Sequence, residues 1–326
     1  MTSTDTPAIR KIGFVGLGIM GGPMAANLLK AGYEVAGYNL TRPQIDRLVE
    51  AGGRGADDIA DAVRDADAVI TMVPADPQVE EVMYGVGGVL ANVRPGTLVV
   101  DMSSIKPSTS VAVAEAGAAL GLRVLDAPVS GGEAGAIEAV LSIMVGGNAA
   151  DFAAALPLFE ALGKTIVHVG PHGAGQTVKA ANQLIVAGNI QLVAEALLFL
   201  EHAGVDTEAG LAVLGGGLAG STVMARKGAA MRAREFAPGF RIDLHHKDMG
   251  IVSEAARELG LVLPFGALAT QLVAALRAQG DGGLDHSGLL LGLERLNGLA
   301  PSPRGAATGN GTGNGPGNGP GNGGGA

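Results

Sequence analysis

Cysteine is absent from this sequence of 326 residues, and aromatic side chains make up only 3% of it. Without cysteine there is no disulfide framework, no thiolate nucleophile and no cysteine-based metal site. The formal net charge of −9, without any cluster of lysine and arginine, argues against a nucleic-acid partner. The first residues, MTSTDTPAIRK, lack the charged-then-apolar order of a signal peptide, so we expect a cytoplasmic protein.

Aliphatic side chains are abundant instead. Hydrophobic residues make up 47% of the sequence, which is enough for sizeable cores built from Ala, Val, Leu, Ile and Met. At about 150 residues per domain, the length allows two domains.

Short apolar runs alternate with helical segments through the first half of the chain. We predict strands at 10–15, 33–38, 68–73, 97–101, 123–126, 141–145 and 165–169, and helices at 23–31, 44–51, 78–84, 106–120 and 149–162. This alternation is typical of an α/β fold with a doubly wound, mostly parallel sheet that helices cover on both faces.

The second half has helical patterns alone, at 175–203, 206–214, 222–233, 245–259, 264–278 and 287–296. The domain boundary therefore falls near 170–173. We expect a flexible N-terminus at 1–9, an α/β domain at 10–172 and an all-helical domain at 173–299. The Gly/Asn/Pro-rich tail at 300–326 cannot bury apolar surface and is expected to be disordered.

The segment 175–203 is apolar nearly all the way round, which in a soluble chain means burial on most sides. A membrane span is the rival interpretation, but polar residues leave no uninterrupted run of about 18 apolar residues. Near its start, Lys179, Asn182 and Gln183 share one helical face, because residues i, i+3 and i+4 are neighbours. A lysine that reaches water from a helix end would explain Lys179 without any function.

Residues Gly16-Leu17-Gly18-Ile19-Met20-Gly21 form a G-x-G-x-x-G motif between a predicted strand and a predicted helix. In this context the motif indicates dinucleotide binding, with a purely structural turn as the alternative. The first glycine permits a tight turn, the second lets the backbone approach a pyrophosphate, and the third lets the helix pack on the strand. The pyrophosphate then lies at the positive N-terminus of the helix.

The next predicted strand ends in Tyr38-Asn39-Leu40-Thr41-Arg42 and lacks the acidic residue that would hold a ribose 2′-hydroxyl. An amide, a hydroxyl and a nearby arginine suit a 2′-phosphate, unless Arg42 merely faces solvent. Of the two forms of the cofactor NAD(P)H, the sequence therefore slightly favours NADP.

The stretch 13–32 (GFVGLGIMGGPMAANLLKAG) resembles the N-terminal signature of the β-hydroxyacid dehydrogenase family, and the resemblance covers about residues 10–298. Further matching stretches are 101–104 (DMSS), 126–132 (DAPVSGG), the G-x-x-x-K-x-x-N-Q pattern at 175–183, 217–222 (GLAGST) and 238–248 (PGFRIDLHHKD). The last two point to a subgroup that reduces 2-hydroxy-3-oxopropanoate. The family combines a Rossmann domain with a helical domain that completes the active site and associates between subunits, which implies a homodimer or homotetramer.

The resemblance also implies roles for single residues. Lys179 matches the family's catalytic lysine, and Asn182 matches the amide that helps to place this lysine and the substrate. The loop that binds the substrate carboxylate matches Ser130, Gly131 and Gly132. Positions that match the cofactor site, besides the glycine motif, Asn39, Leu40 and Thr41, are Val73, Pro74, Gln78, Ser104 and Lys247.

One position departs from the family pattern. NADP-preferring relatives often have arginine where this chain has Leu40, and NAD-using relatives commonly have an acid just before it. This chain has neither, so the cofactor preference stays open.

These residue types suit the reduction of an aldehyde, which needs a hydride donor, a group that stabilises the developing alkoxide, and a proton. A lysine ammonium supplies the last two, and burial lowers its pKa so that it releases a proton more readily. The Asn182 amide can bridge Lys179 and the substrate. A Ser-Gly-Gly turn can offer N–H groups and a hydroxyl to a carboxylate. The alternatives are a plain strand-ending turn and, for Lys247, a solvated side chain.

No metal site is expected. His245 and His246 are adjacent and would point apart on a helix, and no acidic third ligand accompanies His168 and His172.

We therefore expect a reductase that transfers hydride from NAD(P)H to 2-hydroxy-3-oxopropanoate and yields glycerate, with Lys179 as the general acid. Within the family, the alternative is an enzyme for 3-hydroxyisobutyrate, succinic semialdehyde or glyoxylate. An alternative from another class is a cofactor-binding interaction protein without turnover. The expected partner is a small hydroxy or oxo acid rather than a nucleic acid or a membrane.

Overall fold

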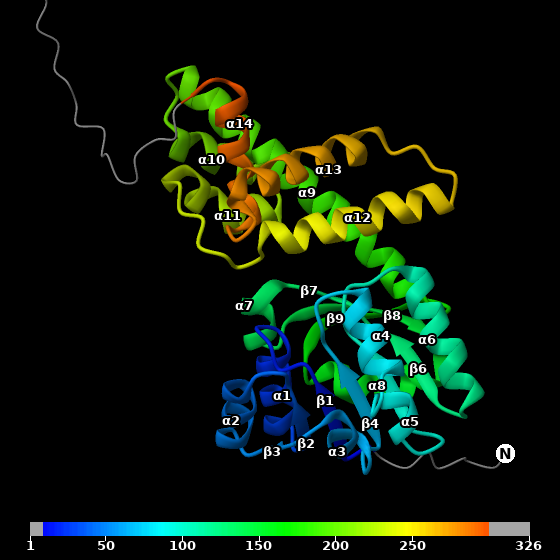
Figure 1. Cartoon of the computed structure of the whole chain (residues 1–326). Coiled ribbons are helices and arrows are strands. Elements are labelled where there is room, and N and C mark those ends of the chain that lie inside the picture. Colours follow the sequence, from blue (N-terminus) through cyan, green and yellow to red (C-terminus); the bar gives the residue numbers. More distant parts are fainter. Residues whose placement is uncertain (1–8, 300–326) are drawn as a thin grey trace, which may run out of the picture.

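The computed structural model describes residues 9–299 and arranges them as an α/β domain and a helical domain (Figure 1). The N-terminal segment that was predicted to be flexible, apart from Ile9, and the predicted tail at 300–326 lie outside the described residues. Figure 1 shows the long helix α9 (Ala174–His202) running from the sheet of the first domain through the second.

The α/β domain contains nearly all of the predicted alternation of strands and helices. Its elements are β1 (Lys11–Val15), α1 (Gly21–Lys30), β2 (Glu34–Tyr38), α2 (Arg42–Glu50), β3 (Arg54–Gly55), α3 (Ile59–Val63), β4 (Ala68–Thr71), α4 (Asp76–Tyr84), α5 (Val89–Asn92), β5 (Leu98–Asp101), α6 (Pro107–Ala119), β6 (Arg123–Asp126), β7 (Val129–Ser130), α7 (Gly132–Ile137), β8 (Leu141–Gly147), α8 (Ala149–Glu160) and β9 (Gly163–Gly170).

The sheet runs in the order β3-β2-β1-β4-β5-β6-β8-β7, and β9 pairs with β8. The pairs from β3 to β6 are parallel. Antiparallel pairing begins where β8 meets β6 and β7, while β9 is parallel to β8. The predicted fold class, a mostly parallel sheet followed by a helical domain, is confirmed.

The central strands are buried on both faces, which explains their continuous apolar sequence. In β4, Ile70 belongs to one hydrophobic cluster while Val69 belongs to the cluster on the other face, because successive side chains of a strand alternate. In β5, Val100 and Val99 divide in the same way. A parallel sheet covered by helices on both sides produces this pattern.

Several short elements were not predicted, namely β3, β7, α3, α5 and α7. β3 and β7 have two residues each and exist because they pair with β2 and β8, so no local pattern announces them. The short helix α3 starts where the Asp58 carboxylate accepts a hydrogen bond from the Asp61 N–H. Four predicted helices also begin two or three residues earlier than expected, at Gly21 (α1), Arg42 (α2), Asp76 (α4) and Ile242 (α12).

The helical domain packs around α9. Its other elements are α10 (Thr207–Gly216), α11 (Thr222–Ala233), α12 (Ile242–Glu258), α13 (Pro264–Leu276), the short turns η1 (Arg277–Asp281) and η2 (His286–Gly288), and α14 (Leu289–Leu296). Buried side chains of α9, among them Ile190, Val193 and Leu197, form a core with Met231 and Leu290.

Within the described residues, α9 is the one helix that is long and apolar enough to cross a membrane by length and composition. Half of its most apolar window is buried inside the protein. Because α9 also packs against β8, α11, α12, α13 and α14, it serves here as a core helix.

The start of α9 is fixed to the carboxyl edge of the sheet. The Asp126 carboxylate, at the end of β6, accepts hydrogen bonds from the N–H groups of Gly173 (2.8 Å) and Gln176 (3.0 Å). The Gln176 side chain accepts a bond from the Ile105 N–H (3.1 Å) and donates one to the Ser103 carbonyl (2.8 Å). These four buried bonds join the two domains at one point.

Replacing Asp126 tests this anchor. Asp126→Ala leaves two buried N–H groups at the start of α9 without an acceptor, so we expect the free energy of unfolding to fall by about 2–4 kcal/mol. Asp126→Asn keeps one acceptor oxygen and serves as the matched control, with a smaller loss. Denaturant unfolding measures both variants, and an Asp126→Ala protein as stable as the wild type would contradict this view of the anchor.

Candidate active site

The G-x-G-x-x-G loop follows β1 and turns sharply into α1. Gly16 has a φ of +99°, which favours glycine, and its N–H donates to the Tyr38 carbonyl (2.9 Å). A Cβ on Gly21 would lie 1.9 Å from the Gly16 carbonyl oxygen, so the helix can approach the turn only without a side chain. A Cβ on exposed Gly18 would meet no atom within 4 Å. The first and third glycines thus serve the fold, while the second leaves open the space that a pyrophosphate needs.

The end of β2 supports the same loop. The Asn39 side-chain oxygen accepts a hydrogen bond from the Leu17 N–H (3.0 Å), and its amide donates to the Thr41 hydroxyl (2.8 Å). Leu40 is 89% exposed. Arg42 forms a surface ion pair with Asp46 (2.8 Å), so its guanidinium already has an acidic partner.

The ends of β4 and β5 bring further predicted cofactor positions to the same edge of the sheet. The Thr71 hydroxyl donates to the Asp101 carboxylate (2.7 Å), and the Ser103 hydroxyl accepts from the Val73 N–H (3.0 Å). Burial raises the pKa of Asp101 to about 6, although hydrogen bonds from Thr71 and Ser103 act to lower it. These contacts place Val73 and Ser104 on neighbouring loops, while Pro74 and Gln78 lie exposed beside them.

Lys179 lies in the second turn of α9 and is 8% exposed. Its ammonium group donates a hydrogen bond to the Val129 carbonyl (2.7 Å). Burial lowers the pKa of Lys179 to about 8, with the Asp248 carboxylate acting to raise it and the Lys247 ammonium to lower it further. Lys179 is therefore held against the strand that leads directly into the Ser130–Gly132 loop, and it does not reach out into water.

The Ser130–Gly132 loop joins β7 to α7. Gly131 has a φ of +145° and Gly132 a φ of +64°, conformations that a residue with a side chain rarely adopts. The two glycines therefore allow a sharp backbone turn between β7 and α7 that bulkier residues would disfavour. From the helical domain, the Arg226 guanidinium donates to the Gly131 carbonyl (3.3 Å).

A polar network extends from Lys179 into α12. The Asn182 amide donates to the Gln183 side-chain oxygen (2.7 Å), and the Gln183 amide donates to the Asp248 carboxylate. Lys247 contacts Asp248 (2.9 Å) and donates to the Ser104 carbonyl, so it reaches from the helical domain to the segment that follows β5. No hydrogen bond joins Asn182 to Lys179 in the described chain, since the Asn182 amide is engaged by Gln183.

Sequence reasoning gave no role to Asp126, Gln176 or Asp248. Gln176 lies three residues before Lys179 in the sequence, and Asp248 directly follows Lys247, so proximity to matched residues was the available signal. Each of these side chains acts through a partner more than 40 residues away, which no local pattern shows. Among the described residues, no group of three or more histidine or acidic side chains is placed to hold a metal ion.

Comparisons with known proteins cover both domains. Residues 11–170 match a family model described as the NAD binding domain of 6-phosphogluconate dehydrogenase. Residues 173–292 match one described as NAD-binding of NADP-dependent 3-hydroxyisobutyrate dehydrogenase.

Individual relatives align along nearly their whole length. The 2-hydroxy-3-oxopropionate reductase of Escherichia coli K12 is 45% identical over 284 residues, which span 87% of this chain and 97% of the relative. The 3-hydroxyisobutyrate dehydrogenase of Pseudomonas aeruginosa is 42% identical over 285 residues, spanning 85% and 95%. Among solved structures, Mycobacterium tuberculosis 3-hydroxyisobutyrate dehydrogenase with L-serine matches with a TM-score of 0.80 and 32% identity, covering 87% of this chain and 99% of that one.

The dinucleotide-binding fold of the first domain and these matches define an NAD(P)-dependent oxidoreductase. Within that class, the chain belongs to the β-hydroxyacid dehydrogenase family, the family that its sequence signature resembles.

Two glycine substitutions separate cofactor binding from folding. Gly18→Ala adds a methyl group to open space, so we expect unchanged thermal stability and cofactor affinity at least about tenfold weaker, because the backbone no longer approaches the pyrophosphate closely. Gly21→Ala, the matched control, places its Cβ against the Gly16 carbonyl and should destabilise the domain by about 1–3 kcal/mol. Fluorescence titration and thermal unfolding test both, and full cofactor affinity in Gly18→Ala would exclude this loop as the pyrophosphate site.

Proposed function

We propose that this chain is a reductase that transfers hydride from NAD(P)H to 2-hydroxy-3-oxopropanoate and yields glycerate. The observation that carries the proposal is the position of Lys179, a buried ammonium group 2.7 Å from the carbonyl of Val129, beside the Ser130–Gly132 loop. A proton donor and an anion-binding loop are adjacent there, as a substrate with both an aldehyde and a carboxylate requires.

The chain's own groups divide the work as follows. The Gly16–Gly21 loop and the ends of β2, β4 and β5 would hold the nicotinamide nucleotide, which supplies the hydride. The Ser130–Gly132 loop binds the substrate carboxylate through its N–H groups and the Ser130 hydroxyl. Lys179 then turns from Val129 to the aldehyde oxygen, stabilises the negative charge that develops there, and donates a proton from Nζ.

The choice of substrate rests on sequence similarity within this family. The E. coli relative at 45% identity is a 2-hydroxy-3-oxopropionate reductase, and the GLAGST and PGFRIDLHHKD stretches point to the same subgroup. The Pseudomonas relative at 42% identity favours 3-hydroxyisobutyrate as the second candidate. A cofactor-binding protein without turnover is disfavoured because Lys179 is retained and buried, which would serve no purpose in such a protein.

For the cofactor, we infer a modest preference for NADPH. The β2 end offers Asn39 and Thr41 and no carboxylate that would hold a 2′-hydroxyl or repel a 2′-phosphate. Arg42 is within the same turn, but Asp46 already neutralises it, which limits the preference.

We also propose that the enzyme is cytoplasmic and forms a homodimer or homotetramer. Ile185, Leu192 and Phe199 are 63%, 56% and 75% exposed and recur every seven residues, so they form an apolar stripe along one face of α9. A second copy of the chain would cover this stripe.

Sedimentation equilibrium should show an oligomer that Phe199→Glu weakens, and a monomer in the wild type at micromolar concentration would refute the proposal.

Steady-state kinetics with a substrate panel tests the proposed reaction. We expect 2-hydroxy-3-oxopropanoate to give a higher kcat/KM than succinic semialdehyde or glyoxylate in reduction. In the oxidation direction, glycerate should exceed 3-hydroxyisobutyrate, and NADPH should exceed NADH in reduction. If another acid is preferred, the substrate assignment is wrong, and a strong preference for NADH would overturn the cofactor assignment.

Lys179 gives the reaction a distinctive pH dependence. As a general acid it must be protonated for reduction, so kcat/KM for reduction should fall as pH rises through about 8. The reverse oxidation needs the neutral amine and should rise through the same pH. Lys179→Met keeps an unbranched side chain one atom shorter, without the amine, and should lower turnover at least about 100-fold with cofactor affinity nearly unchanged. Near-normal turnover in Lys179→Met would remove the mechanism.

A further inference from the structure

Two buried histidines face each other next to α9, the helix that carries Lys179, and the proposed reaction uses neither. His245, on α12, is fully buried, and His286, in η2, is 8% exposed. Their Nδ1 atoms lie 3.0 Å apart, and His245 Nε2 lies 3.3 Å from the main-chain carbonyl of Gln183 on α9. The Phe240 ring packs edge-on against both imidazoles, with ring centres 5.7 and 5.2 Å away.

These contacts determine where the protons lie. The Gln183 carbonyl can only accept, so His245 must carry a proton on Nε2. A neutral His245 then has a bare Nδ1, which accepts the hydrogen bond from His286. His286 must therefore carry its proton on Nδ1. Two neutral imidazoles in opposite tautomers satisfy every contact, whereas a second proton on His245 would oppose the Nδ1–H of His286.

The charged groups around the pair agree with two neutral rings. Asp285 neighbours His286, but its carboxylate accepts from Lys227 (2.8 Å), the N–H groups of Gly239 and Phe240, and the Ser287 hydroxyl.

The Asp248 carboxylate acts to raise the pKa of His245, and the Lys179 ammonium acts to lower it. Burial lowers the pKa of both histidines, and the His245 ring lowers that of His286 further.

His245 connects this histidine pair to Gln183, a residue of the candidate site. Gln183 presents its carbonyl to His245, its amide to Asp248, and its side-chain oxygen to Asn182. Asp248 in turn acts electrostatically on Lys179, four residues before Gln183 on α9. The contact between α12 and α9 thus sets how the Asp248 carboxylate faces the lysine.

We propose that His245 and His286 are positioning residues, held in opposite neutral tautomers, that lock α12 against Gln183 and thereby keep Asp248 in place beside Lys179. The tautomers follow from the two ring contacts together with the neutral state that burial imposes on both rings, whereas the effect on Lys179 rests on the proposed function.

The first experiment uses the wild-type protein and needs no activity. Nitrogen-15 NMR of histidine-labelled enzyme at pH 7 distinguishes the two neutral tautomers and the charged ring, with signals assigned through His245→Asn and His286→Asn. We expect His245 protonated at Nε2 and His286 at Nδ1. The same tautomer in both rings, or a charged ring in either, would overturn the proposal.

The second experiment compares two variants of one residue. His286→Asn places an amide N–H where Nδ1–H lies and cannot titrate, while His286→Leu removes the donor. We expect His286→Leu to lower kcat about tenfold. It should also shift the basic limb of the pH profile down by about half a pH unit, because the Asp248 carboxylate, which acts to raise the pKa of Lys179, is released. His286→Asn should restore both values to within about twofold of the wild type.

A merely structural pair would behave differently. His286→Leu would then lower the unfolding temperature without moving the basic limb, and His286→Asn would restore nothing in the pH profile; either result refutes the positioning role. If Lys179→Met keeps its turnover, the proposed function fails instead, and the NMR result still decides the tautomers.

Discussion

The attachment of α9 to the carboxyl edge of the sheet is the constraint on which the candidate site depends. Asp126 holds the first turn of α9, and the same chain segment continues through Val129 into the Ser130–Gly132 loop. Gln176 adds a second attachment, to the segment after β5. One short region therefore fixes the helix that carries Lys179, the strand that Lys179 contacts and the Ser130–Gly132 loop that we propose binds the substrate.

Burial then tunes the groups held there. Removing the Lys179 ammonium from water disfavours its charged form and brings its pKa to about 8, close to physiological pH. The same effect raises the pKa of Asp101, at the end of β5, to about 6. The charged form of Lys179 is stabilised in this setting by the hydrogen bond to the Val129 carbonyl and by the Asp248 carboxylate, which the second domain supplies.

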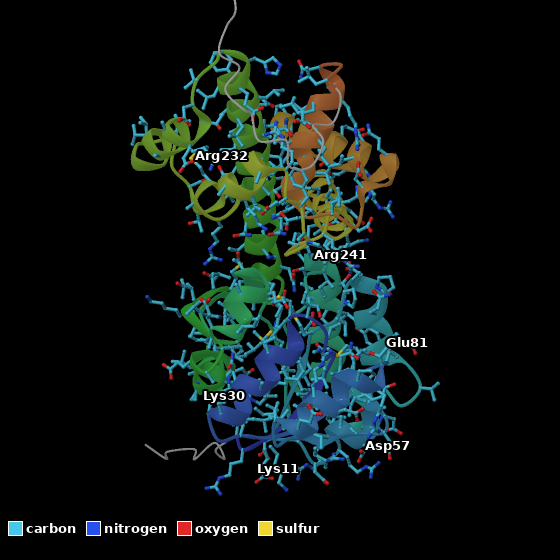
Figure 2. All side chains as sticks on the ribbon, turned by 90° about the vertical axis from the view of Figure 1, so that its left-hand side faces the viewer. Lys11, Lys30, Asp57, Glu81, Arg232 and Arg241 are labelled. Atoms are coloured by element: carbon cyan, nitrogen blue, oxygen red, sulfur yellow. The ribbon has the colours of Figure 1, made fainter. Side chains whose placement is uncertain are left out.

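Figure 2 shows Arg241, at the start of α12, beside the junction of the domains, whereas Lys11, Lys30, Asp57 and Glu81 lie on the lower domain away from it.

The sequence was informative wherever structure follows from local pattern. Continuous apolar runs marked β1, β4 and β5, helical spacing marked α9 to within a residue at each end, and the glycine motif marked the turn after β1. The contacts that build the site were not visible. Asn182 turns to Gln183, and Gln183 reaches Asp248 and His245, through partners that only the folded chain brings together. Two-residue strands such as β7 depend in the same way on a neighbour.

The most direct measurement is a crystal structure of the protein with an oxidised nicotinamide nucleotide and glycerate. The account predicts that Lys179 Nζ leaves Val129 and lies about 3 Å from the hydroxyl oxygen on the terminal carbon of glycerate, with the carboxylate on the Ser130–Gly132 loop. A complex in which Nζ stays on Val129 and the hydroxyl lies beyond its reach would contradict the account.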